Sequence, residues 1–208
     1  MKPITAVVLG AGSRGATYAG YAKEFPEDLQ VVAVAEPRAD RRDLLADELD
    51  IPEDGRFASW QELLARPRMA DCAFICTLDD DHTAPALRAM ELGYHVLLEK
   101  PACPDAAAFA RLTALARENG VVLLEAMRSV FTPGFRALRE AGAKVGKVRR
   151  VSFTYCQYSS RYDAYKRGVV ENAFDPAFCN GSLMDIGVYC AHALEALFGL
   201  PEEMAADA

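Results

Sequence analysis

Short apolar runs alternate with segments of helical periodicity over the first 124 residues of the chain. The apolar runs predict strands near residues 4–9, 29–35, 72–76, 95–98 and 121–124. The amphipathic segments between and after them predict helices near residues 13–24, 39–49, 59–66, 82–92 and 105–118. Runs such as 72–76 and 121–124 are apolar at every position, as strands are when helices cover both faces of a sheet. The alternation therefore predicts an α/β fold with a doubly wound parallel sheet.

The pattern changes after about residue 125, so we expect a first domain over residues 1–125 and a second over residues 126–208. Helices are predicted near 133–142 and 183–198. Near 147–158, Val151, Phe153 and Tyr155 alternate with polar residues, which predicts one long strand with a buried and a solvent-facing side. One strand cannot form a sheet. We therefore expect an incomplete α+β domain whose strand pairs with another chain, with the first domain or with residues outside this sequence.

Composition and charge narrow the functional classes. The chain has 208 residues, is 51% hydrophobic and 25% charged, and falls in the ordinary globular range. Its net charge of −7 and short basic clusters argue against a nucleic-acid or anionic-membrane surface. We find neither an apolar run of membrane-spanning length nor a secretion signal at the start. The six cysteines form no CxxC pair and have no histidine at metal-ligand spacing, so we expect a cytoplasmic protein without a metal site.

A glycine-rich segment directly follows the first predicted strand and opens the first helix: Gly10, Ala11, Gly12, Ser13, Arg14 and Gly15. Glycines at this spacing allow a sharp turn, the close approach of a pyrophosphate and tight packing of helix on strand. The N-terminus of the helix directs N–H groups and a positive dipole end toward the phosphates. This arrangement predicts a Rossmann-type dinucleotide site, with three ordinary turn glycines as the alternative.

The acidic residue that ends the second strand bears on the choice of cofactor. Glu36 follows the glycines at about the 20-residue interval where a carboxylate accepts hydrogen bonds from the adenosine ribose hydroxyls. Such a carboxylate favours NAD, because it repels the 2′-phosphate of NADP. Arg38 keeps NADP open as the alternative, since one of its rotamers offers a phosphate partner.

Polar residues follow two further strands, at the edge of the sheet where ligands of a parallel sheet bind. After strand 72–76, we expect Thr77 and Asp79 to face ribose or nicotinamide and His82 to lie at the pocket rim. Helix capping by the neighbouring aspartates explains this segment equally well. After strand 95–98 comes Glu99-Lys100-Pro101. A lysine there is costly to bury unless it faces a cleft, where it can hold a hydroxyl and stabilise a developing alkoxide.

The helix predicted near 183–198 carries a third group of polar residues. Asp185, Tyr189 and His192 stand at i, i+4 and i+7, so a carboxylate, a phenol and an imidazole would share one face. That face can transfer protons. The alternative is structural: Ser182 and Asp185 form a capping pair, and the two rings are packing or surface residues.

Over its whole length, the chain resembles the Gfo/Idh/MocA family of oxidoreductases. The resemblance is carried, in this order, by the glycine loop, Glu36, the 77–82 segment, Glu99-Lys100-Pro101 and the 185–192 helix. The family includes glucose-fructose oxidoreductase and inositol dehydrogenase. The resemblance implies hydride transfer between a nicotinamide cofactor and a sugar, cyclitol or related polyol. It also implies that Lys100 contacts substrate and nicotinamide ribose and that Asp185 supports the site. Members often have histidine where this chain has Tyr189, so Tyr189 and His192 are both candidate proton donors.

The resemblance further implies a longer chain whose second domain contains a large open sheet and often joins subunits. We therefore expect a truncated second domain here, and a homo-oligomer in the full-length form. The catalytic candidates are Lys100, Asp185, Tyr189 and His192. The cofactor-binding candidates are Gly10, Ala11, Gly12, Ser13, Arg14, Gly15, Glu36, Arg38, Thr77, Asp79, His82, Glu99 and Lys100. The alternative function is a non-catalytic dinucleotide-binding fragment or redox-responsive module. A methyltransferase with a similar glycine loop leaves Lys100 and the 185–192 helix without a role.

Overall fold

The computed structural model describes residues 2–205, except for the side chain of Pro176. The chain divides into two compact units, Met1–Ala126 and Met127–Ala208. The first unit contains all the strands of the described residues, and the second contains helices joined by extended chain.

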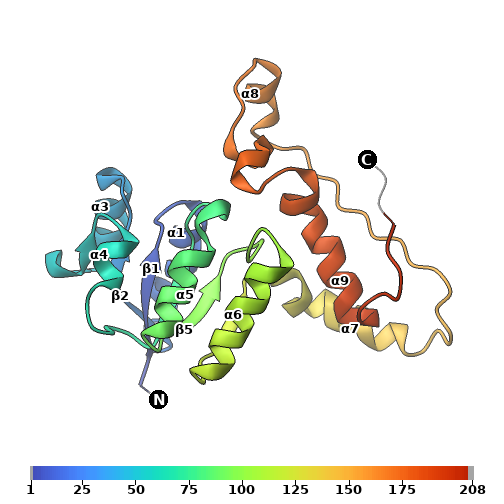
Figure 1. Ribbon diagram of the computed structural model, residues 1–208, viewed down its shortest axis with the longest axis horizontal. Helices are drawn as coiled ribbons and strands as arrows, with labels where there is room; N and C mark the ends of the chain where they lie inside the picture. The colour runs from blue at the N-terminus through green and yellow to red at the C-terminus, as the bar shows by residue number, and fades with distance from the viewer. Residues whose placement is uncertain (1, 206–208) are drawn as a thin grey trace. The chain divides into compact units, whose positions relative to one another are not determined.

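A single parallel sheet of six strands forms the centre of the first unit, in the order β3-β2-β1-β4-β5-β6 (Figure 1). Its strands are β1 (Ile4–Leu9), β2 (Leu29–Ala35), β3 (Arg56–Phe57), β4 (Cys72–Ile75), β5 (His95–Leu98) and β6 (Leu123–Glu125). Val8 of β1 lies opposite Val34 of β2 on one side and Phe74 of β4 on the other. The strand order reverses between β1 and β4. In doubly wound sheets, ligands bind beyond the carboxyl ends of the strands at this point.

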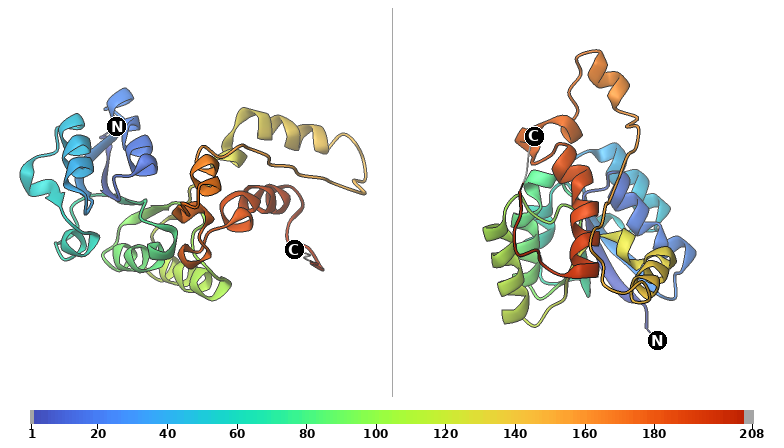
Figure 2. Two further views of the ribbon diagram at one scale, coloured as in Figure 1. Left: turned by 90° about the horizontal axis from the view of Figure 1, so that it is seen from above. Right: turned by 90° about the vertical axis from the view of Figure 1, so that its right-hand side faces the viewer.

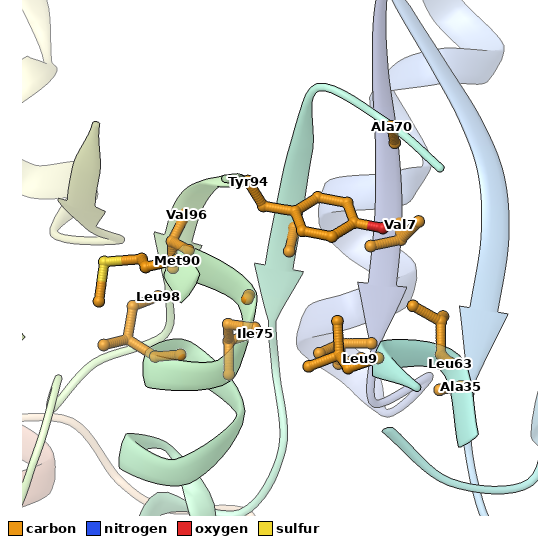
Figure 3. Close-up of a cluster of buried hydrophobic side chains, with 14 of the residues drawn as sticks. Val7, Leu9, Ala35, Leu63, Ala70, Ile75, Met90, Tyr94, Val96 and Leu98 are labelled. Atoms are coloured by element: carbon orange, nitrogen blue, oxygen red, sulfur yellow. The ribbon is translucent and has the colours of Figure 1, made fainter. Parts of the chain in front are cut away.

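Helices cover both faces of this sheet, which confirms the predicted α/β fold. They are α1 (Ser13–Ala19), α2 (Tyr21–Glu24), α3 (Ala39–Glu48), α4 (Trp60–Leu64), α5 (Thr83–Glu91) and α6 (Ala106–Glu118), with 3-10 turns at Glu53–Gly55 and Asp79–Asp81. Val7 and Leu9 of β1 pack in one core cluster with Met90 of α5 (Figure 3). Val8, between them, packs in a second cluster with Leu45 of α3. Successive residues of one strand therefore bury against opposite helix layers, which explains why the strand is apolar throughout.

Two local features of the first unit differ from the sequence expectations. The helix expected over residues 13–24 is divided into α1 and α2 at Gly20, a residue with low helix propensity. The strand β3 was not expected, because two residues at a sheet edge are too short to produce a periodic pattern.

The second unit begins with a 3-10 turn (Arg128–Phe131) and continues with α7 (Pro133–Gly142), α8 (Tyr162–Lys166), 3-10 turns at Asn172–Phe174 and Pro176–Phe178, a π-helical turn (Leu183–Gly187) and α9 (Val188–Phe198). The strand expected near 147–158 is wrong: this segment runs between α7 and α8 without a hydrogen-bonded strand partner (Figure 2). Val151, which the alternation assigned to a buried face, is 41% exposed. An alternating pattern specifies a strand only where another strand pairs with it, so the described residues of this unit form helices, helical turns and irregular chain in place of the predicted α+β arrangement.

Candidate functional site

The glycine loop between β1 and α1 has a different steric requirement at each of its three glycines. Gly10 has φ +97°, and a Cβ atom there would lie 2.3 Å from the carbonyl oxygen of Cys76. A Cβ atom at Gly15 would lie 1.9 Å from the carbonyl oxygen of Gly10. At Gly12, in contrast, a Cβ atom would meet only the Arg41 guanidinium, at 3.9 Å. Gly10 and Gly15 are therefore needed for the turn and the packing, whereas Gly12 leaves open backbone that fits the approach of a pyrophosphate.

Of the remaining loop residues, Ser13 and Arg14 are exposed in the first turn of α1, and Ala11 is buried. The N-cap residue of this helix is Gly12, which has no side chain to accept from the first N–H groups. A helix N-terminus that begins in this way suits an anionic ligand.

The carboxylate of Glu36, at the end of β2, is only 3% exposed and is engaged within the protein. One oxygen accepts from the N–H of Ala11 at 2.9 Å, and the other accepts from Nε of Arg38 at 2.9 Å and from its N–H at 3.1 Å. Burial opposes ionisation, but the hydrogen bonds and charge of Arg38 outweigh it and lower the pKa of Glu36. The residue expected to meet ribose hydroxyls thus also holds the glycine loop to the end of β2.

Glu99, directly after β5, is likewise buried, with 6% exposure. It accepts from the Lys100 N–H at 2.6 Å and from the Tyr18 hydroxyl, and Nε of Arg14 lies 3.6 Å from its carboxylate. Burial, with the hydrogen bond and charge of Glu99, raises the pKa of Tyr18. Lys100 is itself buried, with 8% exposure, between Glu99 and Pro101. Tyr18 was not singled out from the sequence, because a tyrosine at a helix interior carries no local signal of such a contact.

The segment after β4 differs from the expectation at His82. The expectation that His82 lies at the pocket rim is wrong: its side chain is fully buried. Its Nδ1 lies 2.8 Å from the carbonyl oxygen of Pro101 and its Nε2 3.3 Å from that of Thr77. Asp79 lies near the same ring, with its carboxylate 3.9 Å from Nε2. A buried ring whose two nitrogens face the carbonyl oxygens of Pro101 and Thr77 fixes the geometry of the two loops from inside the protein.

The capping alternative for this segment is wrong as well. The N-cap residue of α5 is His82 and not one of the aspartates, and the His82 side chain makes no capping bond. The Asp81 carboxylate instead accepts from the Trp60 indole N–H at 2.9 Å, and its carbonyl oxygen accepts from the Thr77 hydroxyl at 2.7 Å. These bonds hold the loop in place between α4 and α5.

In the second unit, the helix predicted near 183–198 begins with a π-helical turn, so Asp185 lies in a different helix type from Tyr189 and His192. The three residues therefore do not follow the single α-helical spacing that was expected, although π-helical turns frequently occur at functional sites. The ring of Tyr189 stacks on Tyr155, with centroids 4.9 Å apart. Among the described residues, buried Nδ1 of His192 has no hydrogen-bond partner. Ser182 makes no side-chain capping bond, which contradicts the capping part of the structural alternative. The buried, stacked ring of Tyr189 agrees with its packing part.

Residues 4–127 match a family model described as an oxidoreductase family with an NAD-binding Rossmann fold. The chain belongs to the Gfo/Idh/MocA family of oxidoreductases. This Gfo/Idh/MocA chain is 41% identical over 181 residues to scyllo-inositol 2-dehydrogenase (NADP(+)) IolU of Bacillus subtilis, covering 87% of the chain and 54% of IolU. It is 32% identical over 179 residues to mouse trans-1,2-dihydrobenzene-1,2-diol dehydrogenase, covering 85% of the chain and 51% of the mouse protein. The chain thus spans about half the length of these curated relatives.

Solved structures share the fold of this Gfo/Idh/MocA chain. GenD2 from gentamicin A biosynthesis, in complex with NAD, matches with a TM-score of 0.78 and 21% identity, over 96% of this chain and 54% of GenD2. The WlbA dehydrogenase of Bordetella pertussis, in complex with NADH and UDP-GlcNAcA, matches with a TM-score of 0.79 and 17% identity, over 95% of this chain and 56% of WlbA.

Within residues 2–205, no helix is long and apolar enough to cross a bilayer.

Proposed function

We propose that the protein transfers a hydride between a nicotinamide cofactor and a sugar, cyclitol or related polyol. The observation that carries this proposal is the glycine loop, where Gly12 leaves open backbone beside the point at which the strand order reverses. Lys100 follows β5 at the same edge of the sheet. The names of IolU and of the mouse diol dehydrogenase support a substrate that carries hydroxyl groups.

The proposed roles follow the chemistry of each side chain. When bound, the nicotinamide ring supplies the hydride acceptor or donor. Gly12, Ser13 and Arg14 would contact the phosphates, and Glu36 with Arg38 would border the adenosine ribose. The Lys100 ammonium would hold a substrate hydroxyl and stabilise the negative charge that develops on its oxygen.

Five further residues complete the proposed machinery. Thr77 and Asp79 remain candidates for contact with ribose or nicotinamide. In the second unit, Tyr189 or His192 would exchange the proton of the substrate hydroxyl, and Asp185 would support that exchange. A phenol and an imidazole both serve as general acids and bases, so the choice between Tyr189 and His192 is left to mutation.

NAD is the proposed cofactor and NADP the alternative. Glu36 supports NAD because its carboxylate places negative charge beside the adenosine ribose, and the lowered pKa of Glu36 keeps that charge at neutral pH. Arg38, whose side chain is 52% exposed, supports the alternative, as does the NADP(+) in the name of IolU.

We also propose a cytoplasmic location and a homo-oligomer in the full-length form. Large apolar side chains exposed in the second unit support further association, among them Val145 at 71% and Leu183 at 76% exposure. Sedimentation of the full-length protein as a monomer would contradict the oligomer.

Fluorescence titration with NADH and NADPH, followed by a screen of polyols and sugars, tests the function. Lys100→Met is expected to lower turnover at least about 100-fold while NADH binding persists, because the ammonium acts on charge that develops during the reaction. Lys23→Met is the matched control, since Lys23 forms a surface ion pair with Glu48 at 3.2 Å. Equal turnover in both variants would contradict the role of Lys100. NADH binding without oxidation of any polyol or sugar would instead favour the non-catalytic module.

A further inference from the structure

A buried carboxylate joins the helix of the glycine loop to the main chain of Lys100. Glu99 is 6% exposed and accepts from the Tyr18 hydroxyl and, at 2.6 Å, from the Lys100 N–H. Arg14 brings its guanidinium to 3.6 Å from the same carboxylate. Arg14 and Tyr18 stand four residues apart on α1, so both side chains reach Glu99 from one face of that helix.

The contacts of Glu99 join segments that follow two strands which are not neighbours in the sheet. In the sheet, β4 lies between β1, which leads into the glycine loop, and β5, which leads into Lys100. Cys76, directly after β4, lies close enough for the charge of Glu99 to act on its thiol. Burial and that charge raise the pKa of Cys76, so the thiol stays neutral and adds no second anion. Glu99 is therefore the anionic centre of a contact between two loops that are far apart in sequence.

The partners of Glu99 account for its burial. An ionised carboxylate is costly to remove from water unless charged or hydrogen-bonding groups compensate it. The Tyr18 hydroxyl, the Lys100 N–H and the Arg14 guanidinium provide that compensation. Glu99 is therefore a shared acceptor for α1 and for the loop after β5.

We propose that Glu99 is a positioning residue that ties the glycine loop to Lys100, so that the cofactor loop and the amine keep a fixed relation within the first unit. The catalytic meaning of this link rests on the proposed function, because it requires that Lys100 contacts substrate. The link itself does not, and it can be measured without a substrate.

The test uses Glu99→Gln, Tyr18→Phe and the double variant in the full chain. A carboxamide cannot accept from both the Tyr18 hydroxyl and the Lys100 N–H while it faces a guanidinium, so Glu99→Gln loosens the link. We expect each single variant to weaken NADH binding about fivefold in fluorescence titration, and the double variant to be little weaker than Glu99→Gln. Tyr21→Phe is the matched control, because Tyr21 lies on the neighbouring helix α2 and its hydroxyl donates to Asp28 at 3.2 Å. It is expected to bind NADH normally.

Acetylation of lysines with acetic anhydride, followed by mass spectrometry, supplies the second measurement. Lys100 is 8% exposed, and its rate relative to the surface residue Lys23 is expected to rise about fivefold in Glu99→Gln. Unchanged NADH affinity and unchanged Lys100 reactivity in this variant would overturn the proposal, as would additive effects in the double variant. Should Glu99→Gln fail to fold, the NADH affinity of Tyr18→Phe tests the proposal alone, because this variant removes one hydroxyl and keeps the carboxylate of Glu99. Failure of polyol oxidation with the coupling intact would contradict only the proposed function.

Discussion

Nδ1 of His82 lies 2.8 Å from the carbonyl oxygen of Pro101. His82 belongs to the loop after β4, and Pro101 follows Lys100 in the loop after β5, so the two loops are joined by a fully buried side chain. Glu36 and Glu99 make comparable buried contacts, with the N–H of Ala11 and with the N–H of Lys100. Buried polar side chains therefore hold the loops that follow the strands around the proposed cofactor site.

Replacing His82 with alanine is expected to lower the free energy of unfolding by about 2–4 kcal/mol, because a buried ring and its hydrogen bonds are lost. Urea denaturation measures this loss. The control is His95→Ala, since His95 is exposed and accepts one bond from the Val122 N–H. Equal losses in the two variants would show that His82 does not hold the loops.

Replacing Gly15 and Gly12 by alanine is expected to have different outcomes. Gly15→Ala is expected to destabilise the fold by more than about 3 kcal/mol, because its Cβ atom would lie 1.9 Å from a backbone oxygen. Gly12→Ala is expected to keep its thermal midpoint and to weaken NADH binding at least about tenfold, because the new methyl group occupies the approach of the pyrophosphate. Thermal unfolding and NADH titration separate the two effects. Normal NADH binding by Gly12→Ala would contradict the loop as a phosphate site.

Glu36 predicts a dependence of stability on acid. The pKa of Glu36 is lowered in the folded protein. The ionised carboxylate therefore contributes to the free energy of unfolding above its unfolded pKa of about 4.3, and this contribution is lost as the pH falls through its folded pKa. Between pH 7 and pH 3, the wild type is therefore expected to lose more unfolding free energy than Glu36→Gln. Denaturant titrations across this range test the difference. Parallel curves for the two proteins would show that Glu36 is not held as an anion.

Tyr18 predicts the opposite dependence, at alkaline pH. The pKa of Tyr18 is raised in the folded protein. The protonated phenol therefore contributes to the free energy of unfolding below its unfolded pKa of about 10, and this contribution is lost as the pH rises toward its folded pKa. Part of the loss of stability above pH 10 should therefore disappear in Tyr18→Phe. Tyr165→Phe, at an exposed tyrosine of the second unit, serves as the comparison in the same denaturant series. A wild type and Tyr18→Phe with the same alkaline slope would contradict the contact with Glu99.

Much of the first unit followed from local patterns in the sequence. The runs around β1, β2, β4 and β5 were recognisable because each strand is buried on both faces. The glycine loop was recognisable because Gly10 has a positive φ and a Cβ atom at Gly15 would meet the carbonyl oxygen of Gly10, which are backbone limits that act over a few residues. The break at Gly20 was missed because one glycine is often tolerated within a helix.

The contacts of the polar residues depended on tertiary structure. Glu36 meets Ala11 across 25 residues, and Glu99 meets Tyr18 across 81 residues, so neither pairing leaves a local signal. Likewise, the interior position of His82 depends on where the loop after β5 passes. The 147–158 segment had the alternation of a strand but no partner to pair with, because pairing belongs to the assembled sheet. The sequence by itself determined most of the elements of the first unit and where the glycine loop lies, since backbone sterics and periodicity are local. Only the tertiary structure decided what each buried charge contacts, since compensation of a desolvated group requires partners brought together by folding.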